Sequence, residues 1–367
     1  MKLRIGILGT RGIPNSYGGF EQFAGYLSKG LVVRGHEVCV YNSHKHPYQE
    51  NSWNGVNIIH CYDPEYLLGA AGQFIYDLNC IRDARKRKFD ILLILGYTSS
   101  SIWGRLYPEK TMIITNMDGL EWKRSKYAAP VQRFLQYAEK WAVQFSHRLV
   151  ADSIPIKEYL AGKYQIDATY ISYGAEIPEM IDERLLEKCK VTKGNYYLLI
   201  ARMEPENHIE TILDGLSKCK TEQQILVIGN TQNEFGKRLV EKFRNQSRII
   251  FAGAVYDAGV LNALRACCLL YFHGHSVGGT NPSLLEAMAC GALICAHDNG
   301  FNRAVLQEDA FYFYADDDVT ELVNDLDAKD ISRKTDRNLQ KIREYHDWDM
   351  IIGSYEQLFI QAYQSGK

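Results

Sequence analysis

The chain has 367 residues, of which 46% are hydrophobic and 23% are charged. A single hydrophobic core rarely grows beyond about 250–300 residues, so this length predicts two domains. The 42 Lys and Arg residues nearly balance the 44 Asp and Glu residues, so the charge gives no support to a nucleic-acid partner.

Short apolar runs alternate with segments of helical periodicity along the whole chain. In the first half the predicted strands are 3–8, 37–42, 56–61, 90–95, 111–116 and 148–152, and the predicted helices are 20–34, 72–88 and 128–146. In the second half the predicted strands are "YYLLIA", "QILVIG", "RIIFAG", "LLYFHG" and "ALICAH", separated by helical stretches near 208–219, 234–244, 257–266 and 283–290. This alternation predicts parallel sheets that are covered by helices on both faces.

The two sets of strands exceed one doubly wound sheet, and a polar stretch at 173–195 separates them. We therefore expect two Rossmann-like domains of the α/β class that face each other across a cleft. Ligands of such sheets bind beyond the carboxyl ends of the strands, so the sequence predicts a ligand between the two domains.

A glycine-rich loop, "GTRGIPNSYGGFE", connects the first predicted strand to the first predicted helix. Gly9 ends the strand, and Gly18 and Gly19 stand directly before the helix. Glycine lets backbone N–H groups approach an anion, and a helix N-terminus adds partial positive charge. The loop is therefore interpreted as a phosphate or sugar-phosphate cradle, with an ordinary flexible turn as the alternative. It lacks the G-x-G-x-x-G spacing of dinucleotide-binding proteins and the P-loop pattern.

A second glycine-rich loop lies in "HGHSVGGTNPSLLEAMACG", which follows a predicted strand. Pro282 suits the first position of a helix, and Asn281 is its expected cap. Gly278 and Gly279 bring the backbone close to whatever lies at the helix N-terminus.

Glu286 follows one turn into this second helix. A carboxylate there can accept hydrogen bonds from ribose hydroxyls while the loop amides hold a diphosphate. The alternative is an ordinary helix residue exposed to solvent.

Arg202 follows the first predicted strand of the second half, in "LLIARMEPEN". The planar guanidinium group of Arg202 can donate two hydrogen bonds to one phosphate and keeps its positive charge. We therefore expect this side chain to project into the cleft. A surface ion pair with Glu204 or Glu206 is the alternative.

The segments "ARMEPEN" and "NPSLLEAMACG" together with the first glycine-rich loop resemble the GT-B glycosyltransferases of family 4, and the resemblance covers essentially the whole chain. The stretches "GTRGIPNSYGGFE", "NMDGLEWKR" and "HGHSVGGTNPSLLEAMA" most resemble a narrower group, the retaining bacterial β-1,4-rhamnosyltransferases. Those enzymes transfer L-rhamnose from dTDP-L-rhamnose during assembly of capsule, O-antigen or cell-wall polysaccharide.

The resemblance implies a division of the chain and an arrangement of the last segment. Chains of this fold commonly return a C-terminal helix to the first domain. We expect an acceptor-side domain of residues 1–175 plus 350–367, a linker at 176–189 and a nucleotide-sugar-binding domain at 190–349.

The resemblance also implies roles for individual residues. In the family the first glycine-rich loop lies against the donor diphosphate, and the arginine after the first strand of the second domain neutralises it, which implies a catalytic role for Arg202. The residues implied in substrate binding are Gly12, Gly18, Gly19, Gly279, Thr280, Asn281 and, at the ribose, Glu286.

This chain departs from the family pattern at two positions. Many relatives have a lysine where this chain has Asn207, and Arg11 or another loop residue is then expected to supply the missing charge. Many relatives also have a glutamate where this chain has Gly278. Its loss suits a donor sugar without one of the usual hydroxyl groups, such as a 6-deoxyhexose.

Asp118 occupies the place where many relatives carry a histidine near the donor sugar and the acceptor. A carboxylate there could orient the acceptor hydroxyl or balance charge on an oxocarbenium-like transition state. A helix N-cap is the alternative role. Retaining enzymes of this fold have no agreed nucleophile, and front-face attack assisted by the leaving phosphate is the usual account.

We expect no metal and no cofactor besides the nucleotide-sugar donor. The sequence has no D-x-D motif placed after a strand, and His273 and His275 lack further obvious ligands. The cluster "ADDD" at 315–318 is predicted to be a loop before a helix.

The protein is expected in the cytoplasm, because its nine cysteines include no C-x-x-C pair and no apolar run reaches the roughly 20 residues of a membrane span. The basic runs 82–88 and 121–127 are explained by solvated helix faces or, alternatively, by contact with anionic lipid at the inner membrane surface. The expected partners are a nucleotide sugar and a saccharide or polyprenyl-diphosphate-linked acceptor. A family 4 transferase that uses a UDP- or GDP-hexose, a nucleotide-sugar epimerase and a silent binding subunit remain as alternatives.

Overall fold

A computed structural model describes residues 1–16, 18–124, 126–326 and 332–366. Tyr17 of the first glycine-rich loop, Ser125 of the second basic run and Lys367 at the end of the predicted last segment lie outside these residues. The chain forms two compact units. The first comprises Met1–Lys123, Tyr127–Tyr173 and Trp348–Lys367, and the second comprises Arg124–Lys126 and Gly174–Asp347.

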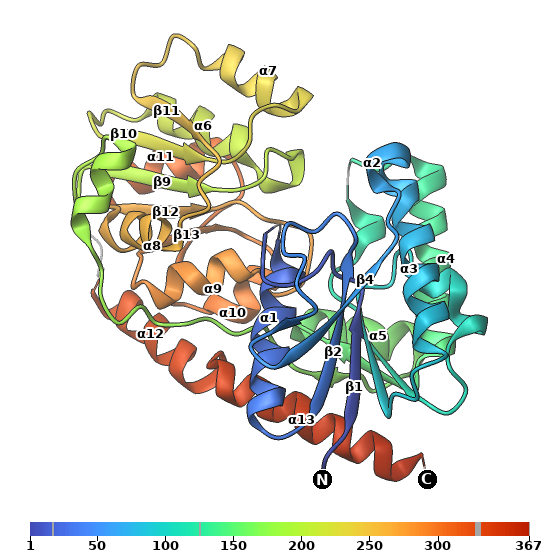
Figure 1. Ribbon diagram of the computed structural model, residues 1–367. Helices are drawn as coiled ribbons and strands as arrows, with labels where there is room; N and C mark the ends of the chain where they lie inside the picture. Colours follow the sequence, from blue (N-terminus) through green and yellow to red (C-terminus); the bar gives the residue numbers. More distant parts are fainter. Residues whose placement is uncertain (17, 125, 327–331, 367) are drawn as a thin grey trace. The chain divides into compact units, whose positions relative to one another are not determined.

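The first unit is built on an eight-stranded sheet with the order β3-β4-β2-β1-β5-β6-β7-β8 (Figure 1). Only β3 and β4 pair antiparallel among its neighbouring described strands. The strands are β1 (Arg4–Leu8), β2 (Glu37–Ser43), β3 (Ser52–Trp53), β4 (Val56–Cys61), β5 (Ile91–Leu95), β6 (Met112–Asn116), β7 (Arg148–Ala151) and β8 (Thr169–Tyr170). The helices are α1 (Gly19–Val33), α2 (Glu65–Leu68), α3 (Ala70–Ala84), α4 (Ala129–Phe145), α5 (Ile154–Tyr164) and α13 (Trp348–Ser365), with the 3₁₀ helices η1 (Ser101–Leu106) and η2 (Glu121–Lys123).

The second unit has a six-stranded sheet with the order β11-β10-β9-β12-β13-β14. All neighbouring strands of the described part of this sheet pair parallel. The strands are β9 (Tyr196–Ile200), β10 (Gln224–Ile228), β11 (Ile249–Gly253), β12 (Leu270–His273), β13 (Ile294–His297) and β14 (Phe311–Phe313). The helices are α6 (Ile209–Lys218), α7 (Glu234–Lys242), α8 (Ala258–Cys267), α9 (Pro282–Ala289), α10 (Gly300–Leu306), α11 (Asp316–Asn324) and α12 (Ser332–Tyr345), with the 3₁₀ helices η3 (Glu183–Cys189) and η4 (Pro205–Asn207).

Helices cover both faces of the second sheet, which explains why its central strands are apolar throughout (Figure 1). Alternate side chains of β9, including Tyr197 and Leu199, pack into a cluster with residues of α6, α7 and α11. Tyr196 points to the other face, where its hydroxyl donates to the carbonyl oxygen of Leu264 in α8 at 2.6 Å. The prediction of an α/β protein with two parallel sheets is confirmed.

The predicted strands and helices match observed elements, usually to within two residues. The short strands β3, β8 and β14 and the helices α2, α5, α10 and α12 were not predicted. Two or three residues carry too little periodicity, and α5 has no clear apolar face.

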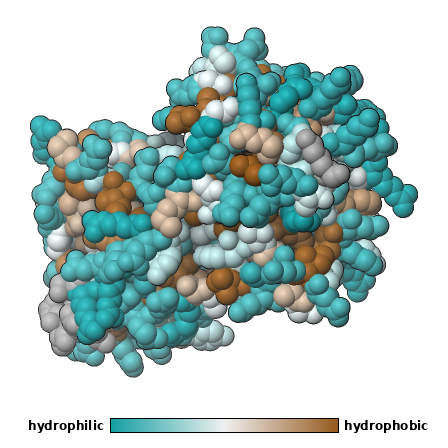
Figure 2. Space-filling view, turned by 90° about the horizontal axis from the view of Figure 1, so that it is seen from below, coloured by the Kyte–Doolittle hydropathy of each residue, from teal (hydrophilic) through white to brown (hydrophobic). Residues whose placement is uncertain are grey.

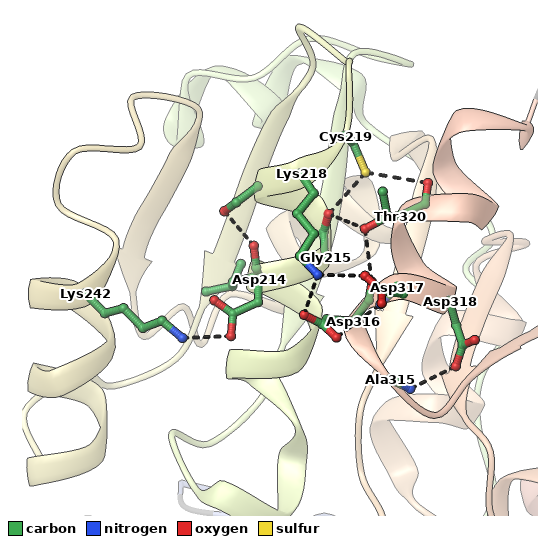
Figure 3. Close-up of polar contacts among 12 residues, drawn as sticks. Asp214, Gly215, Lys218, Cys219, Lys242, Ala315, Asp316, Asp317, Asp318 and Thr320 are labelled. Atoms are coloured by element: carbon green, nitrogen blue, oxygen red, sulfur yellow. Dashed lines mark hydrogen bonds and ion pairs between the residues drawn. The ribbon is translucent and has the colours of Figure 1, made fainter.

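The prediction that 315–318 forms a loop is wrong, since Asp316 to Asp318 form the first turn of α11. Asp318 accepts hydrogen bonds from the backbone N–H groups of Tyr314 and Ala315, both at 2.8 Å. Lys218 of α6 forms ion pairs with Asp316 at 2.8 Å and with Asp317 at 2.7 Å (Figure 3). The acidic cluster therefore starts a helix, where carboxylates interact favourably with the helix dipole.

The helix α13 packs against α1 in the first unit. The rings of Trp348 and Tyr26 stack with their centroids 4.4 Å apart, and the ring centroids of Tyr355 and Phe23 are 5.3 Å apart. At the end of α1, Arg34 forms an ion pair with Glu356 at 2.8 Å.

On the face shown in Figure 2, hydrophobic residues form separate patches among predominantly hydrophilic ones. None of the helices in the described part of the chain combines the length and the apolar composition that a bilayer span requires. The nine cysteines are present as free thiols, six of them buried.

Candidate active site

Each sheet reverses its strand order next to its first strand, between β1 and β5 in the first unit and between β9 and β12 in the second. Open α/β sheets bind ligands at such a switch point, beyond the carboxyl ends of the strands. The first glycine-rich loop follows β1. In the second unit, Arg202 follows β9 and the loop 274–281 follows β12. The topology therefore brings Arg202 and the second glycine-rich loop to the same edge of one sheet.

In the first glycine-rich loop, two glycines are explained by packing within the chain. A Cβ on Gly9, which has φ +93°, would lie 2.2 Å from the carbonyl oxygen of Leu95. A Cβ on Gly12, which has φ +131°, would lie 2.4 Å from Cγ of Asn42. The sequence analysis attributed the missing side chains to a bound anion, but the close neighbours of these two residues are β5 and β2. Gly12 is also buried, and its N–H donates to Oγ1 of Thr10 at 3.2 Å.

Glu21, in the first turn of α1, holds this loop from inside. Its Oε1 atom accepts hydrogen bonds from the Arg11 backbone N–H at 2.8 Å and from the Thr10 hydroxyl at 3.1 Å, and the residue is 4% exposed. Gly18 precedes α1 as its N-cap, as predicted, whereas Gly19 is the first residue of the helix rather than the residue before it. The sequence analysis missed Glu21, although an acidic residue in a first helical turn was a readable signal.

The side chain of Arg11 is already matched by a carboxylate. Its Nε and Nη2 atoms lie 2.9 and 2.6 Å from the two oxygens of Glu65 in α2. Arg11 could supply the positive charge of the absent lysine only if it also contacted the ligand while paired with Glu65, or if this ion pair broke.

Asp118 lies two residues beyond β6 in the first unit and is half-buried. Its backbone has φ +49°, and its N–H donates to Oδ1 of Asn116 at 2.9 Å. The hydroxyl of Tyr173 donates to Oδ1 of Asp118 at 3.4 Å. Because the next helical residue is Glu121 of η2, Asp118 is not the N-cap of a helix.

Arg202 is exposed two residues beyond β9, and its guanidinium has no hydrogen bond or ion pair among the residues that the structure describes. The predicted alternative, a pair with Glu204 or Glu206, is wrong. Glu204 instead forms an ion pair with Lys126, with 3.6 Å between Oε1 and Nζ. Glu206 forms one with Arg124, with 3.5 Å between Oε1 and Nη1. The Arg202 charge is therefore available to an anion.

Asn207, which stands where many relatives have a lysine, has a structural role. Its Nδ2 atom donates to the carbonyl oxygen of Arg202 at 2.7 Å, and the residue is 4% exposed. It closes the turn that carries Arg202. Gly274 is required beside it, because a Cβ there would lie 2.0 Å from the Asn207 carbonyl oxygen.

The second glycine-rich loop leads into α9 as predicted. Pro282 is the first residue of α9, and Asn281 caps it by accepting a hydrogen bond from the Ser283 N–H at 2.9 Å. Thr280 is 3% exposed, whereas Gly278 and Gly279 are half-buried. A Cβ on Gly278 would have no atom within 4 Å, so space remains at this position.

Glu286 is neither isolated nor simply solvated. Its Oε2 atom lies 2.5 Å from Nη2 of Arg265, a residue of α8 whose side chain is 3% exposed. The sequence analysis missed Arg265, because a lone arginine in an amphipathic helix gives no sign that it points inward.

Four histidines gather at the carboxyl edge of the second sheet. The rings of His273 and His275 stack with their centroids 4.5 Å apart, and those of His208 and His297 stack with their centroids 3.9 Å apart. Burial lowers the pKa of His273 to about 3 and that of His297 to about 4. Burial, His273 and Arg202 hold the pKa of His275 well below its usual range. These rings are neutral at physiological pH and do not add to the charge of Arg202.

Both ring nitrogens of His273 and Nδ1 of His275 are buried without a hydrogen-bond partner in the described chain. Among the described residues, no group of three or more His, Cys, Asp or Glu side chains has the arrangement of a metal site.

Comparisons with known proteins concern the family and the fold. Residues 183–343 match the family model of glycosyl transferases group 1. This match lies within the second unit. Residues 2–176 match a model described as a domain of unknown function, DUF1972. None of the curated proteins matches the sequence.

Three solved structures share the architecture of the whole chain. Sucrose-phosphate synthase from Thermosynechococcus elongatus has a TM-score of 0.81 at 15% identity, covering 99% of this chain and 100% of that one. HepE of Anabaena, solved in complex with UDP and glucose, has a TM-score of 0.77 at 14% identity, covering 98% and 100%. The α,α-trehalose 6-phosphate synthase from Burkholderia multivorans has a TM-score of 0.76 at 9% identity, covering 100% and 98%. These identities show the fold alone, which is that of the GT-B glycosyltransferases.

Proposed function

We propose that the protein is a retaining, metal-independent glycosyltransferase that moves L-rhamnose from dTDP-L-rhamnose to a saccharide or polyprenyl-diphosphate-linked acceptor in bacterial surface polysaccharide synthesis. One observation carries this proposal. In the unit that matches the group 1 glycosyltransferase model, Arg202 is exposed and has no hydrogen-bond or ion-pair partner among the described residues. Arg202 and the capped N-terminus of α9 flank the switch point of the sheet. Both features favour a diphosphate group.

In this proposal Arg202 binds the donor diphosphate and stabilises the charge that develops on it as the glycosidic bond breaks. The backbone of Gly279, Thr280 and Asn281 lies at the N-terminus of α9 and adds N–H donors. Gly18 and Gly19 at the N-terminus of α1 offer the corresponding donors in the first unit. Gly12 remains a proposed contact through its backbone, although its N–H already bonds to Thr10.

Glu286 is proposed to accept a hydrogen bond from a ribose hydroxyl of the donor. Its side chain is 27% exposed, so a ligand can reach it while it stays paired with Arg265. A deoxyribose offers only the 3′-hydroxyl, so Glu286 by itself does not select dTDP over UDP.

The rhamnosyl assignment rests on the motifs of the sequence and on Gly278. The space around that residue would admit a donor sugar, and packing within the chain does not explain its small size. Its φ of +129° is an additional reason for glycine. A UDP-hexose is the competing donor, because HepE was solved with UDP and glucose.

Asp118 is proposed to act near the reacting carbon, where its carboxylate would orient the acceptor hydroxyl or balance positive charge on the sugar. The Tyr173 hydroxyl and the Asn116 side chain fix its position. Departure of the diphosphate and attack on the same face of the sugar would retain the anomeric configuration without a covalent intermediate.

A peripheral contact with the inner membrane surface is part of the proposal for a lipid-linked acceptor. In the run 82–88, Arg87 is paired with Asp83 and Arg85 donates to the carbonyl oxygen of Leu106, while Lys86 is exposed. Flotation with anionic and with neutral vesicles tests this contact. Equal recovery with both would contradict the electrostatic attraction.

The donor is tested by incubating the protein with labelled dTDP-rhamnose, UDP-glucose and GDP-mannose, with and without membrane acceptors. We expect transfer from dTDP-rhamnose that depends on the acceptor. Transfer from UDP-glucose or GDP-mannose alone would replace the donor but keep the reaction class. Conversion of the donor without any acceptor would instead identify an epimerase.

A further inference from the structure

A buried arginine lies on the inner side of Glu286. The side chain of Arg265 in α8 is 3% exposed, whereas that of Glu286 in α9 is 27% exposed. Their atoms Nη2 and Oε2 are 2.5 Å apart. The ion pair therefore extends from the interior of the second unit to its surface.

The difference in exposure between Arg265 and Glu286 indicates that Glu286 does more than neutralise the arginine. A guanidinium keeps its charge at every physiological pH, so a buried arginine needs a carboxylate partner. A carboxylate that served only this purpose could be buried as completely as the arginine. Glu286 instead stays accessible, and it can accept a hydrogen bond from a ligand on its exposed side.

Arg265 also contacts a second residue of the same helix face. Its Nη2 atom donates to Oγ of Ser283 at 3.4 Å, and that oxygen lies 2.9 Å from the hydroxyl of Tyr271 in β12. Ser283 and Glu286 are three residues apart, so they lie on one face of α9. Arg265 thus contacts two residues of α9 one turn apart, directly after Asn281, the N-cap of this helix.

We propose that Arg265 is a positioning residue for the donor nucleotide, which fixes the Glu286 carboxylate toward a ribose hydroxyl without touching the ligand. This inference rests on the proposed function, because it requires a nucleotide sugar at the carboxyl edge of the second sheet. The guanidinium donates to the inner side of the carboxylate, and the ribose O–H donates to its exposed side. The pair would make the orientation of the carboxylate independent of bound ligand.

A double-mutant cycle on the full-length protein tests the inference. The variants are Arg265→Met, Glu286→Gln and the double variant, and calorimetry measures the Kd of each for dTDP-rhamnose and UDP-glucose. Each single substitution is expected to weaken binding of the better ligand about tenfold, equal to about 1.4 kcal/mol. If Arg265 acts through Glu286, the double variant binds within about twofold of Glu286→Gln, because the substitutions are not additive.

Lys341→Met is the matched control for loss of a buried ion pair in the same unit. Lys341 Nζ lies 2.8 Å from Oδ2 of Asp309, and the two side chains are 12% and 8% exposed. The control should lower the Tm, as is also expected of Arg265→Met, and leave the Kd unchanged. Arg265→Lys keeps the positive charge and should bind more tightly than Arg265→Met, which a purely steric role would not produce.

Two results would overturn the inference. One is a folded Arg265→Met variant with the wild-type Kd, and the other is a double variant in which the two losses multiply. If Arg265→Met does not fold, Arg265→Gln, which also removes the charge, takes its place in the cycle under the same criterion. A wild-type Kd for Glu286→Gln would contradict the ribose contact of the proposed function, which separates that failure from a failure of the Arg265 inference.

Discussion

Arg202 projects from the carboxyl end of β9 while the acidic residues that follow it are engaged with other cations. Asn207 fixes the backbone carbonyl of Arg202, so the turn is held although the guanidinium itself has no partner in the described chain. An arrangement that holds the backbone and leaves the charge available is typical of an anion-binding residue.

Replacing Arg202 with alanine is expected to weaken binding of the nucleotide sugar by roughly ten- to a hundredfold, because a charge-assisted hydrogen bond contributes about 1.5–3 kcal/mol. Calorimetry on the folded variant measures the change. Arg238→Ala is the control, since that exposed arginine pairs with Glu210 in α6. Equal affinities of wild type and Arg202→Ala would remove Arg202 from the donor site.

The buried histidines predict a pH dependence of stability. In the unfolded chain a histidine has a pKa near 6.5, whereas burial lowers the pKa of His273 to about 3. The stability that neutral His273 contributes is complete above about pH 6.5. It is lost as the pH falls, because His273 is protonated in the unfolded chain but stays neutral in the folded chain. Burial lowers the pKa of His297 to about 4, so its contribution to stability is also lost as the pH falls from 6.5 to about 4.

His273→Phe keeps an aromatic ring beside Tyr271 and His275 but cannot take up a proton. Between pH 7 and pH 5.5, the free energy of unfolding of the wild type should fall by about 1 kcal/mol more than that of the variant. Chemical denaturation at both pH values measures the difference. The same loss in both proteins would mean that His273 titrates normally.

The residues that the sequence analysis named and those it missed differ in one physical respect. Arg202 and Glu286 could be proposed because they stand at fixed offsets from strand ends and glycines. Arg265 could not, since it acts by pointing inward against Glu286, which is 21 positions away. Burial of a charged side chain depends on tertiary packing, which local periodicity does not report.

At the scale of elements, hydrophobic periodicity was sufficient for most of the longer strands and helices, but α5 and α12 were not predicted. It failed for β14, whose three residues carry no pattern, and for Asp316 to Asp318, whose helix is stabilised by Lys218 of α6, 98 and 99 positions away (Figure 3). Glycines also have two origins that sequence does not separate. Gly9 accommodates a neighbouring strand, while Gly278 has open space beside it.

The contact between α13 and α1 predicts that the C-terminal helix stabilises the first unit. Tyr355 is fully buried against Phe23 and accepts a hydrogen bond from Asn116 at 3.1 Å. Tyr355→Ala should cost about 3–5 kcal/mol, whereas Tyr355→Phe, which loses only the hydrogen bond, should cost about 1 kcal/mol.

Thermal or chemical unfolding checks both values, with exposed Gln361→Ala in the same helix as the control at less than about 0.5 kcal/mol. If Tyr355→Ala were as stable as the control, α13 would not contribute to the first unit.

At the scale of the whole molecule, two consecutive sets of alternating strands and helices were sufficient to predict the α/β class and the parallel sheets. The comparisons place the fold among the GT-B glycosyltransferases and the second unit among group 1 domains. Neither composition nor fold determines the donor sugar, which is why its identity stays a proposal.

The most direct test of the account is acceptor-dependent sugar transfer by the purified protein and by Arg202→Ala, measured with labelled dTDP-rhamnose, UDP-glucose and GDP-mannose and a membrane acceptor. The account predicts that the wild-type protein transfers label from dTDP-rhamnose to the acceptor and releases dTDP, and that Arg202→Ala loses most of this activity. Folded wild-type protein that neither binds nor consumes any of the three donors in the presence of acceptor would contradict it.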